Sequence, residues 1–269
     1  MSRIADMFAR TKSESRPALI AYLTAGDPEP SRTAEMVFAM ERGGADLIEL
    51  GVPFSDPIAD GPVIQRASDR ALRAGTSMRA VLEIARQVRQ RSEIPLLLFT
   101  YLNPTIRYGF ERLASDAASA GIDGCLLTDL SVEEAKEYVQ ACRGAGMDTV
   151  FLVAPTSTER RLKLVAEYSS GFVYLVSRTG VTGEQQRVSS QASDLVARTR
   201  AVTDLPLAVG FGISTAAQVA EVGAIADGVV VGSAIVREIE TAGNVPDLEH
   251  RLEQFLRGLS GGLARRATP

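Results

Sequence analysis

Eight short apolar runs recur along this 269-residue chain, and each is bounded by glycine, proline or aspartate. Runs of this length and composition predict β-strands. They lie at residues 18–24, 46–52, 95–101, 123–129, 148–154, 172–177, 205–211 and 227–233. The segments between them are long enough for helices and carry apolar residues at three- and four-residue spacing, such as Leu162, Val165 and Ala166. The pattern therefore predicts a chain that alternates strand and helix throughout.

Most of these runs are apolar on both faces, which is typical of a parallel sheet with both faces covered by helices. A Gly-x-Asp step recurs before strands at 44–46, 121–123 and 146–148, and more loosely at 223–227. Eight units of about 30 residues use the whole length. We therefore predict an α/β fold, a single-domain (β/α)8 TIM barrel over residues 1–258 with a short extra N-terminal helix, followed by a flexible C-terminal tail at 259–269. A doubly wound open sheet is the alternative.

Composition excludes several classes of function. The 29 Lys and Arg against 33 Asp and Glu give a net charge of −4, which disfavours nucleic acid and anionic membranes as partners. Cys125 and Cys142 lack the spacing of a metal or redox motif, and the single His250 has no other metal-binding residue beside it, so we expect no disulfide and no metal site. Without a signal peptide or membrane span, a cytoplasmic protein is expected.

Two connections are longer than a strand-to-strand crossover needs. One runs from Gly51 to Pro95, and the other follows Ser177 with a glycine-punctuated polar stretch. Long loops in compact domains are commonly functional, and a barrel of this kind places them at its C-terminal rim, where such enzymes keep their active sites. We expect these loops to act as lids that order when a phosphate ligand binds.

Glu49 interrupts an apolar strand. Strand alternation puts Leu47, Glu49 and Gly51 on one face, so the carboxylate lies among apolar neighbours and is costly to ionise unless it is near the barrel mouth. From the spacing, a catalytic group and a strand-end ion pair with an arginine are both open.

Asp60 lies eleven residues further, in a loop rich in proline and glycine. By its position it is either a turn or helix-capping residue, or a second carboxylate that folds over Glu49 for acid–base chemistry.

Glycines follow the last two predicted strands, at Gly210 and Gly212 and again at Gly232 before Ser233. Each precedes a predicted helix, whose N-terminal N–H groups attract anions, and barrels of this kind bind phosphate at these two strand ends. A phosphate site and a pair of structural turns are the two interpretations, and the pairing favours phosphate.

The segment IELGVPFSDPIADGP at 48–62 resembles the signature of the tryptophan synthase alpha chain family. LTAGDP at 23–28, NPTIRYG at 103–109, VAPTS at 153–157, SRTGVTG at 177–183, VGFGIS at 209–214 and VVVGSAIV at 229–236 support the resemblance, which extends over residues 3–258. It implies a carbon–carbon lyase that splits indole-3-glycerol phosphate into indole and glyceraldehyde 3-phosphate by a retro-aldol reaction, without a cofactor in this chain.

The family pattern assigns roles to individual residues. Glu49 is the general acid–base group, Asp60 binds the indole N–H and stabilises the developing positive charge, and Tyr174 is an active-site tyrosine. The pattern further assigns Tyr22, Ile64 and Phe211 to the indole slot, Thr182 to holding the closed lid against Asp60, and Gly183, Gly212, Gly232 and Ser233 to phosphate binding.

The resemblance also implies a partner, a tryptophan synthase beta chain that carries pyridoxal phosphate and receives indole in an αββα tetramer. The rim positions that match its contact surface are Pro53, Asp56, Pro57, Asn103, Pro104 and Ser131. Ser131 and Leu102 depart from the common pattern, which puts the affinity for the beta chain in doubt. We expect Ser131 to form a helix capping box with Glu134.

Three alternatives to a complex-dependent lyase follow from these residues. The departures at Ser131 and Leu102 also fit a stand-alone lyase that releases free indole for secondary metabolism. A catalytically silent subunit would not need Glu49 and Asp60 together. Another phosphate-binding barrel, such as an isomerase, would need a different acid–base pair at its strand ends.

Overall fold

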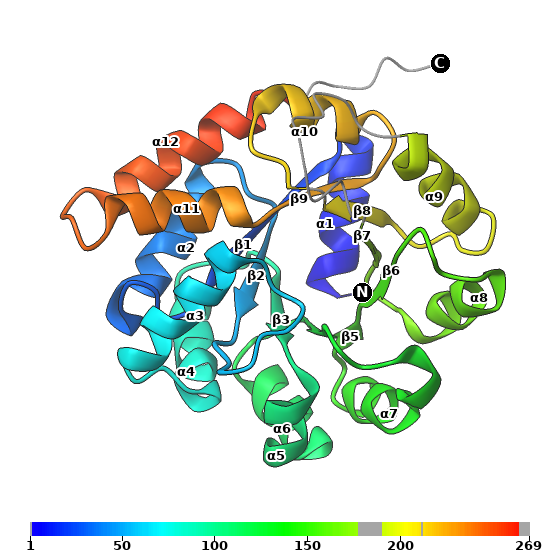
Figure 1. The fold of residues 1–269 in the computed structure, drawn as a ribbon, viewed down its shortest axis with the longest axis horizontal. Coiled ribbons are helices and arrows are strands. Elements are labelled where there is room, and N and C mark those ends of the chain that lie inside the picture. The colour runs from blue at the N-terminus through cyan, green and yellow to red at the C-terminus, as the bar shows by residue number, and fades with distance from the viewer. Residues whose placement is uncertain (1, 177–189, 211, 264–269) are drawn as a thin grey trace.

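Parallel strands form a barrel at the centre of the molecule, and helices surround it (Figure 1). The computed structural model describes residues 2–176, 190–210 and 212–263. Its strands are β1 (Ala18–Thr24), β2 (Leu47–Gly51), β3 (Leu96–Thr100), β4 (Gly124–Leu127), β5 (Asp148–Thr149), β6 (Phe151–Val153), β7 (Val173–Val176), β8 (Leu207–Gly210) and β9 (Gly228–Val231). They lie in the order β5-β4-β3-β2-β1-β9-β8-β7-β6, and all neighbours run parallel. The predicted barrel is confirmed, and the open sheet is wrong.

The fifth predicted strand is present in two pieces. Only Val150 separates β5 from β6, and its N–H donates to the carbonyl of Cys125 at 3.1 Å. The first piece pairs with β4 and the second with β7, so the two ends of the strand order are consecutive in the chain. This one segment therefore closes the barrel, and the eight predicted strands correspond to the nine observed.

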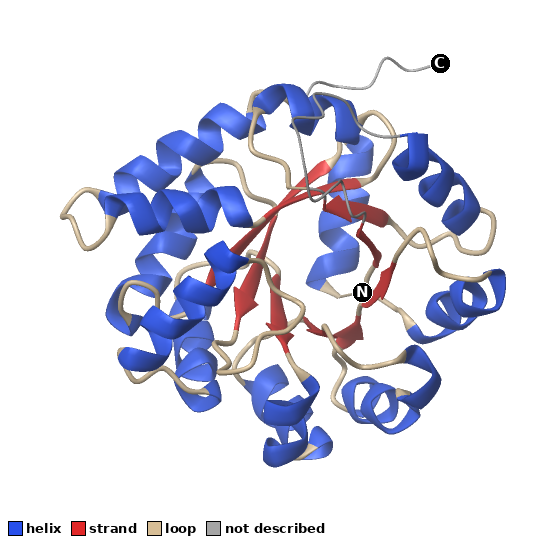
Figure 2. Ribbon diagram, viewed as in Figure 1, coloured by secondary structure: helices blue, strands red, loops and turns tan. Residues whose placement is uncertain are grey.

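Helices cover the outside of the barrel, as Figure 2 shows. They are α1 (Arg3–Ser13), α2 (Thr33–Arg42), α3 (Pro62–Arg73), α4 (Met78–Arg89), α5 (Leu102–Tyr108), α6 (Phe110–Ser119), α7 (Lys136–Gly144), α8 (Glu159–Tyr168), α9 (Ser190–Arg200), α10 (Ala216–Gly223), α11 (Ser233–Ala242) and α12 (Leu248–Ser260), with short 3-10 helices η1 (Pro30–Arg32) and η2 (Val132–Glu134). The long connection from Gly51 contains two of them, α3 and α4. Within the described residues, no helix has the length and apolarity needed to cross a membrane.

The extra N-terminal helix α1 closes the amino-terminal end of the barrel. Ile4, Met7 and Phe8 are buried and pack with strand residues in the barrel interior. The ring of Phe8 lies 5.7 Å from that of Phe172, centroid to centroid. Because this end is filled with apolar side chains, a ligand can enter the barrel only from the carboxyl ends of the strands.

The Gly-x-Asp step joins neighbouring strands at this same end. Gly44, Gly121 and Gly146 have positive φ angles, which end the preceding helix in a conformation that favours glycine. The aspartates that follow accept backbone N–H groups of the adjacent strand: Asp46 from Leu19 at 2.9 Å and Asp123 from Leu96 at 2.8 Å. The repeat is therefore a structural device.

The predicted domain boundary at residue 258 falls inside helix α12. Helix α12 continues to Ser260, and Leu259 is buried three and seven residues beyond the buried Leu256 and Leu252. Leu263 also packs against the core. The apolar spacing of the helix therefore extends past 258, and residues 264–269 of the predicted tail lie outside the described part of the chain.

Candidate active site

Glu49 is buried inside the barrel. Its β2 neighbours Ile48 and Leu50 face the helices, while Leu47 faces the interior, as strand alternation predicts. The side chain is 1% exposed, and its Oε1 has no hydrogen-bond partner among the described residues. Burial raises the pKa of the carboxyl to about 8. No arginine among the described residues binds this group, which disfavours the strand-end ion pair.

A cavity of about 130 Å³ opens beside Glu49 at the carboxyl ends of the strands. It is lined by Tyr22, Glu49, Ile64, Phe99, Tyr174, Gly210, Gly212, Val230, Gly232 and Ser233. Half of these ten residues are aromatic or aliphatic, and Glu49, three glycines and Ser233 form the rest of the wall. Such a cavity fits a ligand with a flat apolar part and a polar end.

Two tyrosines border the carboxyl group, the buried Tyr22 and the half-buried Tyr174. Tyr22 on β1 pairs directly across the sheet with Glu49, and its ring meets that of Phe99 edge-on with centroids 5.2 Å apart. Gly51 makes room for it, because a Cβ at that position would lie 2.2 Å from the Tyr22 hydroxyl. Burial raises the pKa of Tyr22 and of Tyr174 well above the ordinary value, so both stay neutral hydroxyl groups.

Asp60 lies beside the cavity and is not part of its lining. Its Oδ2 accepts the hydroxyl of Tyr101 at 2.8 Å, and that hydroxyl accepts the N–H of Ala59 at 3.1 Å. Burial raises the pKa of Asp60 to about 6, against the opposing effect of the Tyr101 hydrogen bond. Helix α3 begins after Gly61 without a side-chain cap, so the helix-capping interpretation of Asp60 is wrong.

The negative charge of Asp60 contributes to the raised pKa of both Tyr22 and Tyr174, which places its carboxylate near the two cavity tyrosines. Glu49 contributes in the same direction to both. The two carboxyl groups therefore act electrostatically on the same pair of side chains, one from inside the cavity and one from its border.

The polar end of the cavity lies where β8 and β9 end. Gly212 has a φ of +66°, and Gly232 directly precedes Ser233, the first residue of the ten-residue helix α11. All three line the cavity. Free N–H groups of a helix N-terminus next to a small hydroxyl are suited to a phosphate. Three other predicted site residues, Thr182, Gly183 and Phe211, lie outside the described residues.

The predicted partner residues lie on the rim formed by the loops after β2, β3 and β4. Asp56 and Asn103 are exposed and Pro57, Pro104 and Ser131 are half-buried, whereas Pro53 is buried. Two large apolar side chains are exposed on this rim, Ile58 at 83% on the loop after β2 and Ile106 at 58% on helix α5. Exposed apolar groups on a polar rim are typical of a protein contact surface.

The predicted capping box at Ser131 is wrong. The segment that follows is the three-residue 3-10 helix η2, which has no side-chain cap. The Ser131 hydroxyl donates to the carboxylate of Glu133 instead, and the N–H of Glu134 bonds to the backbone carbonyl of Ser131. A single 3-10 turn satisfies this N–H through the backbone, which removes the need for a hydroxyl cap.

Sequence reasoning did not identify Phe99, Tyr101 and Val230 as site residues. Phe99 and Val230 face the interior by strand alternation, in line with Leu97 and Gly228, so parity along the strand was a usable signal. Tyr101 gave no signal, because its contact with Asp60 joins residues 41 positions apart. Within the described ranges, no group of three or more His, Cys, Asp or Glu side chains could hold a metal ion.

Comparisons with known proteins agree with this geometry. The sequence profile of the family described as tryptophan synthase alpha chain matches residues 8–261. The alpha chain of Solibacter usitatus is 64% identical over 267 residues, 99% of this chain and 100% of that one. The alpha chain of Geotalea uraniireducens is 49% identical over 263 residues, 98% of each.

Solved structures of the same family have a similar fold. Tryptophan synthase subunit alpha from Legionella pneumophila has a TM-score of 0.89 at 36% identity, covering 97% of this chain and 98% of that one. A tryptophan synthase structure from Mycobacterium tuberculosis has a TM-score of 0.90 at 39% identity, covering 99% of each chain. Since both the family profile and relatives of full length match, the chain belongs to the tryptophan synthase alpha chain family.

Proposed function

We propose that this chain cleaves indole-3-glycerol phosphate into indole and glyceraldehyde 3-phosphate. The observation that carries the proposal is Glu49, a buried carboxyl group with an unpartnered oxygen in a cavity of aromatic side chains. A protein keeps such a group at a cost in stability, which a proton-transfer role explains. The family and its relatives support this chemistry.

Glu49 enters the reaction protonated, since its pKa of about 8 lies above neutral pH. It donates its proton to the indole carbon that bears the glycerol side chain. The resulting carboxylate then takes the proton of the adjacent side-chain hydroxyl as the carbon–carbon bond breaks. The electron pair of that bond restores the aromatic ring, the hydroxyl becomes the aldehyde, and Glu49 is protonated again. A single buried group serves both steps because its pKa is close to the working pH.

Asp60 stabilises the positive charge that the ring carries between these steps. Its carboxylate accepts the indole N–H, which becomes a stronger donor when the ring carbon is protonated. With a pKa of about 6, Asp60 is mostly ionised at neutral pH while Glu49 is mostly protonated. Two carboxyl groups with separated pKa values can thus take different roles in one site.

The remaining site residues bind and orient the substrate. Tyr22, Ile64, Phe99 and Tyr174 form the wall against which the indole ring packs. Gly212, Gly232 and Ser233 bind the phosphate at the N-terminus of α11. Three further roles rest on the sequence pattern alone. They are Phe211 in the indole slot, Thr182 in the closed lid and Gly183 in the phosphate site.

The reaction is redox-neutral, because it moves one proton from oxygen to carbon and breaks one carbon–carbon bond. The carboxyl groups of Glu49 and Asp60 supply the acid, the base and the counter-charge that it needs. We therefore propose that this chain uses no cofactor, and that pyridoxal phosphate belongs to the partner beta chain.

We propose a beta chain as the partner, bound at the rim that carries Ile58 and Ile106. Both side chains are largely exposed, and they lie next to the predicted contact residues Asp56, Pro57, Asn103 and Pro104. Tyr101 links this rim to the site, because its ring packs on Phe54 with centroids 5.2 Å apart and its hydroxyl holds Asp60. A partner seated on this rim would therefore act on the loop that carries Asp60.

The test is an assay of the purified chain on indole-3-glycerol phosphate, with indole and glyceraldehyde 3-phosphate measured separately after dialysis against a chelator. We expect slow release of both products in equal amounts, and faster release when a purified tryptophan synthase beta chain is added. No cleavage with or without the beta chain would refute the lyase. Rapid cleavage by the chain alone, unchanged by the beta chain, would instead favour a stand-alone lyase.

A further inference from the structure

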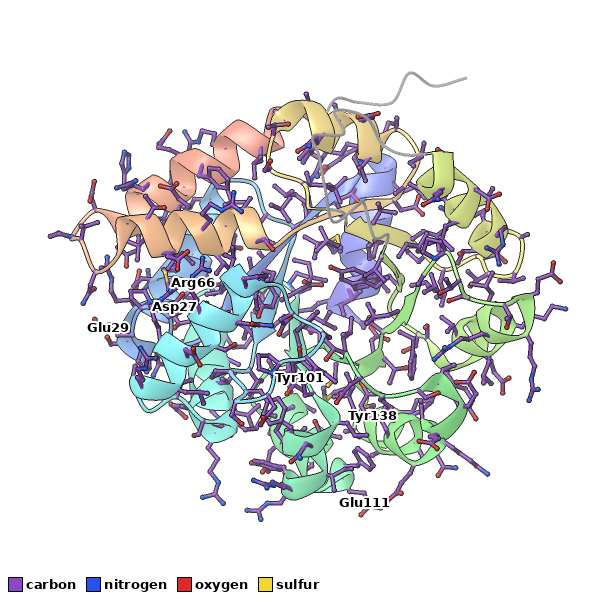
Figure 3. The ribbon with its side chains drawn as sticks, in the orientation of Figure 1. Asp27, Glu29, Arg66, Tyr101, Glu111 and Tyr138 are labelled. Atoms are coloured by element: carbon purple, nitrogen blue, oxygen red, sulfur yellow. The ribbon has the colours of Figure 1, made fainter. Side chains whose placement is uncertain are left out.

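Four charged side chains form a continuous network between the loop after β1, helix α3 and helix α11. Arg70 on α3 binds both carboxylate oxygens of Asp27, at 2.8 and 2.9 Å, and a carboxylate oxygen of Glu240 at 2.9 Å. Arg66, one turn earlier on α3, binds both oxygens of the same Glu240 at 2.6 and 2.8 Å. Figure 3 shows Arg66 and Asp27 together on the side of the barrel where α3 and α11 lie next to each other.

The network joins three elements that border the cavity. Asp27 belongs to the loop after β1, the strand that carries Tyr22. Helix α3 follows the loop of Asp60 directly and carries Ile64 in the cavity wall. Glu240 lies on α11, the helix whose first residue, Ser233, lines the polar end of the cavity.

The same two helices also meet on the cavity side, through apolar contacts. Ala67 of α3 and Val236 of α11 are fully buried in a small cluster with Tyr22. Val236 precedes Glu240 by four residues, so the two lie on the same face of α11. The apolar cluster and the ionic network therefore fix the spacing of α3 and α11 at two successive turns.

Arg70 is the central member of the network. It is the described residue that binds both Asp27 and Glu240, and therefore connects all three elements, whereas Arg66 binds only Glu240. Asp27 is 1% exposed, so its contacts with Arg70 are shielded from water. A planar guanidinium can hold two carboxylates in fixed directions, and a lysine ammonium cannot.

We propose that Arg70 is a positioning residue that couples the phosphate end of the cavity to Asp60. This inference rests on the proposed function. A phosphate bound at the first turn of α11 fixes that helix, and Arg70 transmits its position to α3 and to the loop of Asp60. The substrate would thus be held correctly at its indole end only when its phosphate is in place.

The test compares Arg70→Lys with the matched control Arg32→Lys. Arg32 also binds both oxygens of one carboxylate, that of Glu249, but it joins η1 to α12 away from the cavity. We expect kcat/KM for indole-3-glycerol phosphate to fall about 10- to 100-fold in Arg70→Lys, because a misplacement of about 1 Å can cost about 100-fold. The control should change less than about twofold, with a similar loss of thermal stability.

A double-mutant cycle with Asp60→Asn separates positioning from general destabilisation. If Arg70 positions Asp60, the Asp60→Asn loss in the Arg70→Lys background should be at least about threefold smaller than in the wild type, as for residues that act as one unit. Fully multiplicative losses, or an unchanged kcat/KM in Arg70→Lys, would overturn the proposal. Should Arg70→Lys not fold, Glu240→Gln, which keeps the acceptor oxygen and removes the charge, takes its place in the cycle.

Binding measurements provide a readout that does not depend on turnover. We expect saturating inorganic phosphate to tighten indole binding about fivefold in the wild type and in Arg32→Lys, but not in Arg70→Lys. If the wild type shows this coupling and Arg70→Lys does not, but the wild type fails to cleave the substrate, the proposed function is refuted and the role of Arg70 is supported. A wild type that cleaves the substrate but shows equal coupling in Arg70→Lys would refute Arg70 alone.

Discussion

Asp46 and Glu49 lie three residues apart in the chain, Asp46 just before the amino-terminal end of β2 and Glu49 at the centre of the strand beside the cavity, and both are almost fully buried. Burial alone would raise the pKa of Asp46, but hydrogen bonds from Arg16, from the N–H of Leu19 and from Arg10 lower it below the ordinary value. Glu49 has no such partners, and burial raises its pKa to about 8. The difference between the two carboxyl groups is therefore one of partners and not of burial.

The comparison distinguishes the two ends of the barrel. We call the amino-terminal end of the strands the stabilising end, and the carboxyl-terminal end, where the cavity lies, the reactive end. At the amino-terminal end, Asp46, Asp123 and Asp227 each accept a backbone N–H from the adjacent strand. At the carboxyl-terminal end, Glu49 holds the one carboxylate oxygen among the buried, described side-chain atoms that has no partner. A group whose partner is missing in the folded chain is where a ligand is expected to supply one.

The largest expected effect comes from Glu49→Gln. We expect kcat for indole-3-glycerol phosphate to fall by about 10²–10⁴-fold, since general acid–base groups contribute roughly that much. The side chain keeps its shape, so the circular dichroism spectrum should not change. Asp46→Asn is the control, and the folded protein should keep its kcat because Asp46 precedes the amino-terminal end of β2 and does not line the cavity. Similar turnover in Glu49→Gln and wild type would show that both ends are structural.

Asp46→Ala tests the stabilising end. We expect the free energy of unfolding, measured with urea at pH 7, to fall by about 2–3 kcal/mol, because Arg16 and the N–H of Leu19 lose a buried partner while the half-exposed Arg10 loses less. A lowered pKa stabilises the fold above the ordinary value of 3.8 and no longer does so below the folded pKa. The loss should therefore shrink as the pH falls below 4. A loss that does not change with pH would mean that packing is the cause.

The stability of the wild type should respond to pH in the opposite sense at Glu49. The unfolded carboxyl ionises near pH 4.5 but the folded one only near 8, so the fold binds this proton more tightly and loses stability as the pH rises between these values. Glu49→Gln cannot lose a proton. Relative to this variant, we expect the wild type to lose about 2 kcal/mol or more between pH 5 and 8, because each tenfold change in proton affinity is worth about 1.4 kcal/mol. Parallel urea stability curves would contradict the raised pKa.

The sequence predicts those features of the fold and the site that are determined within one segment of the chain. It does not predict the features that depend on contacts between distant segments. The barrel, the shared strand face of Leu47 and Glu49 and the extra N-terminal helix follow from periodicity within single segments, and all three predictions are confirmed. The break at Val150 and the end of α12 beyond residue 258 were missed, because contacts with neighbouring elements decide them.

Predictions for the active site are limited in the same way, because several of its contacts join residues that are far apart in the chain. Whether Glu49 meets an arginine is decided by elements far along the chain, so parity could orient the carboxyl group but could not choose between an ion pair and a reactive group. The hydrogen bond from Tyr101 to Asp60 joins the start of α5 to the loop after β2, and no local pattern indicates it. Ser131 was assigned a cap from spacing alone, although the backbone there forms a 3-10 turn.

Tyr101→Phe should change activity less than Glu49→Gln does. It tests whether the Tyr101 hydroxyl lowers the pKa of Asp60 at the reactive end. The Tyr101 hydroxyl donates to the ionised form of Asp60 and lowers its pKa, so its removal should raise that pKa above about 6. In the proposed mechanism Asp60 accepts the indole N–H in its ionised form, and we therefore expect the acid limb of kcat/KM against pH to move up by as much as about one pH unit. Activity at pH 7 should fall by less than about tenfold and recover partly toward pH 8.

Tyr138→Phe is the matched control for Tyr101→Phe. The buried Tyr138 hydroxyl (Tyr138 is labelled in Figure 3) donates to the carbonyl of Cys125 at 2.7 Å, and Tyr138 is not part of the cavity lining. An acid limb that moves equally in both variants would show that Tyr101 does not tune Asp60, and that the two ends of the barrel differ only at Glu49.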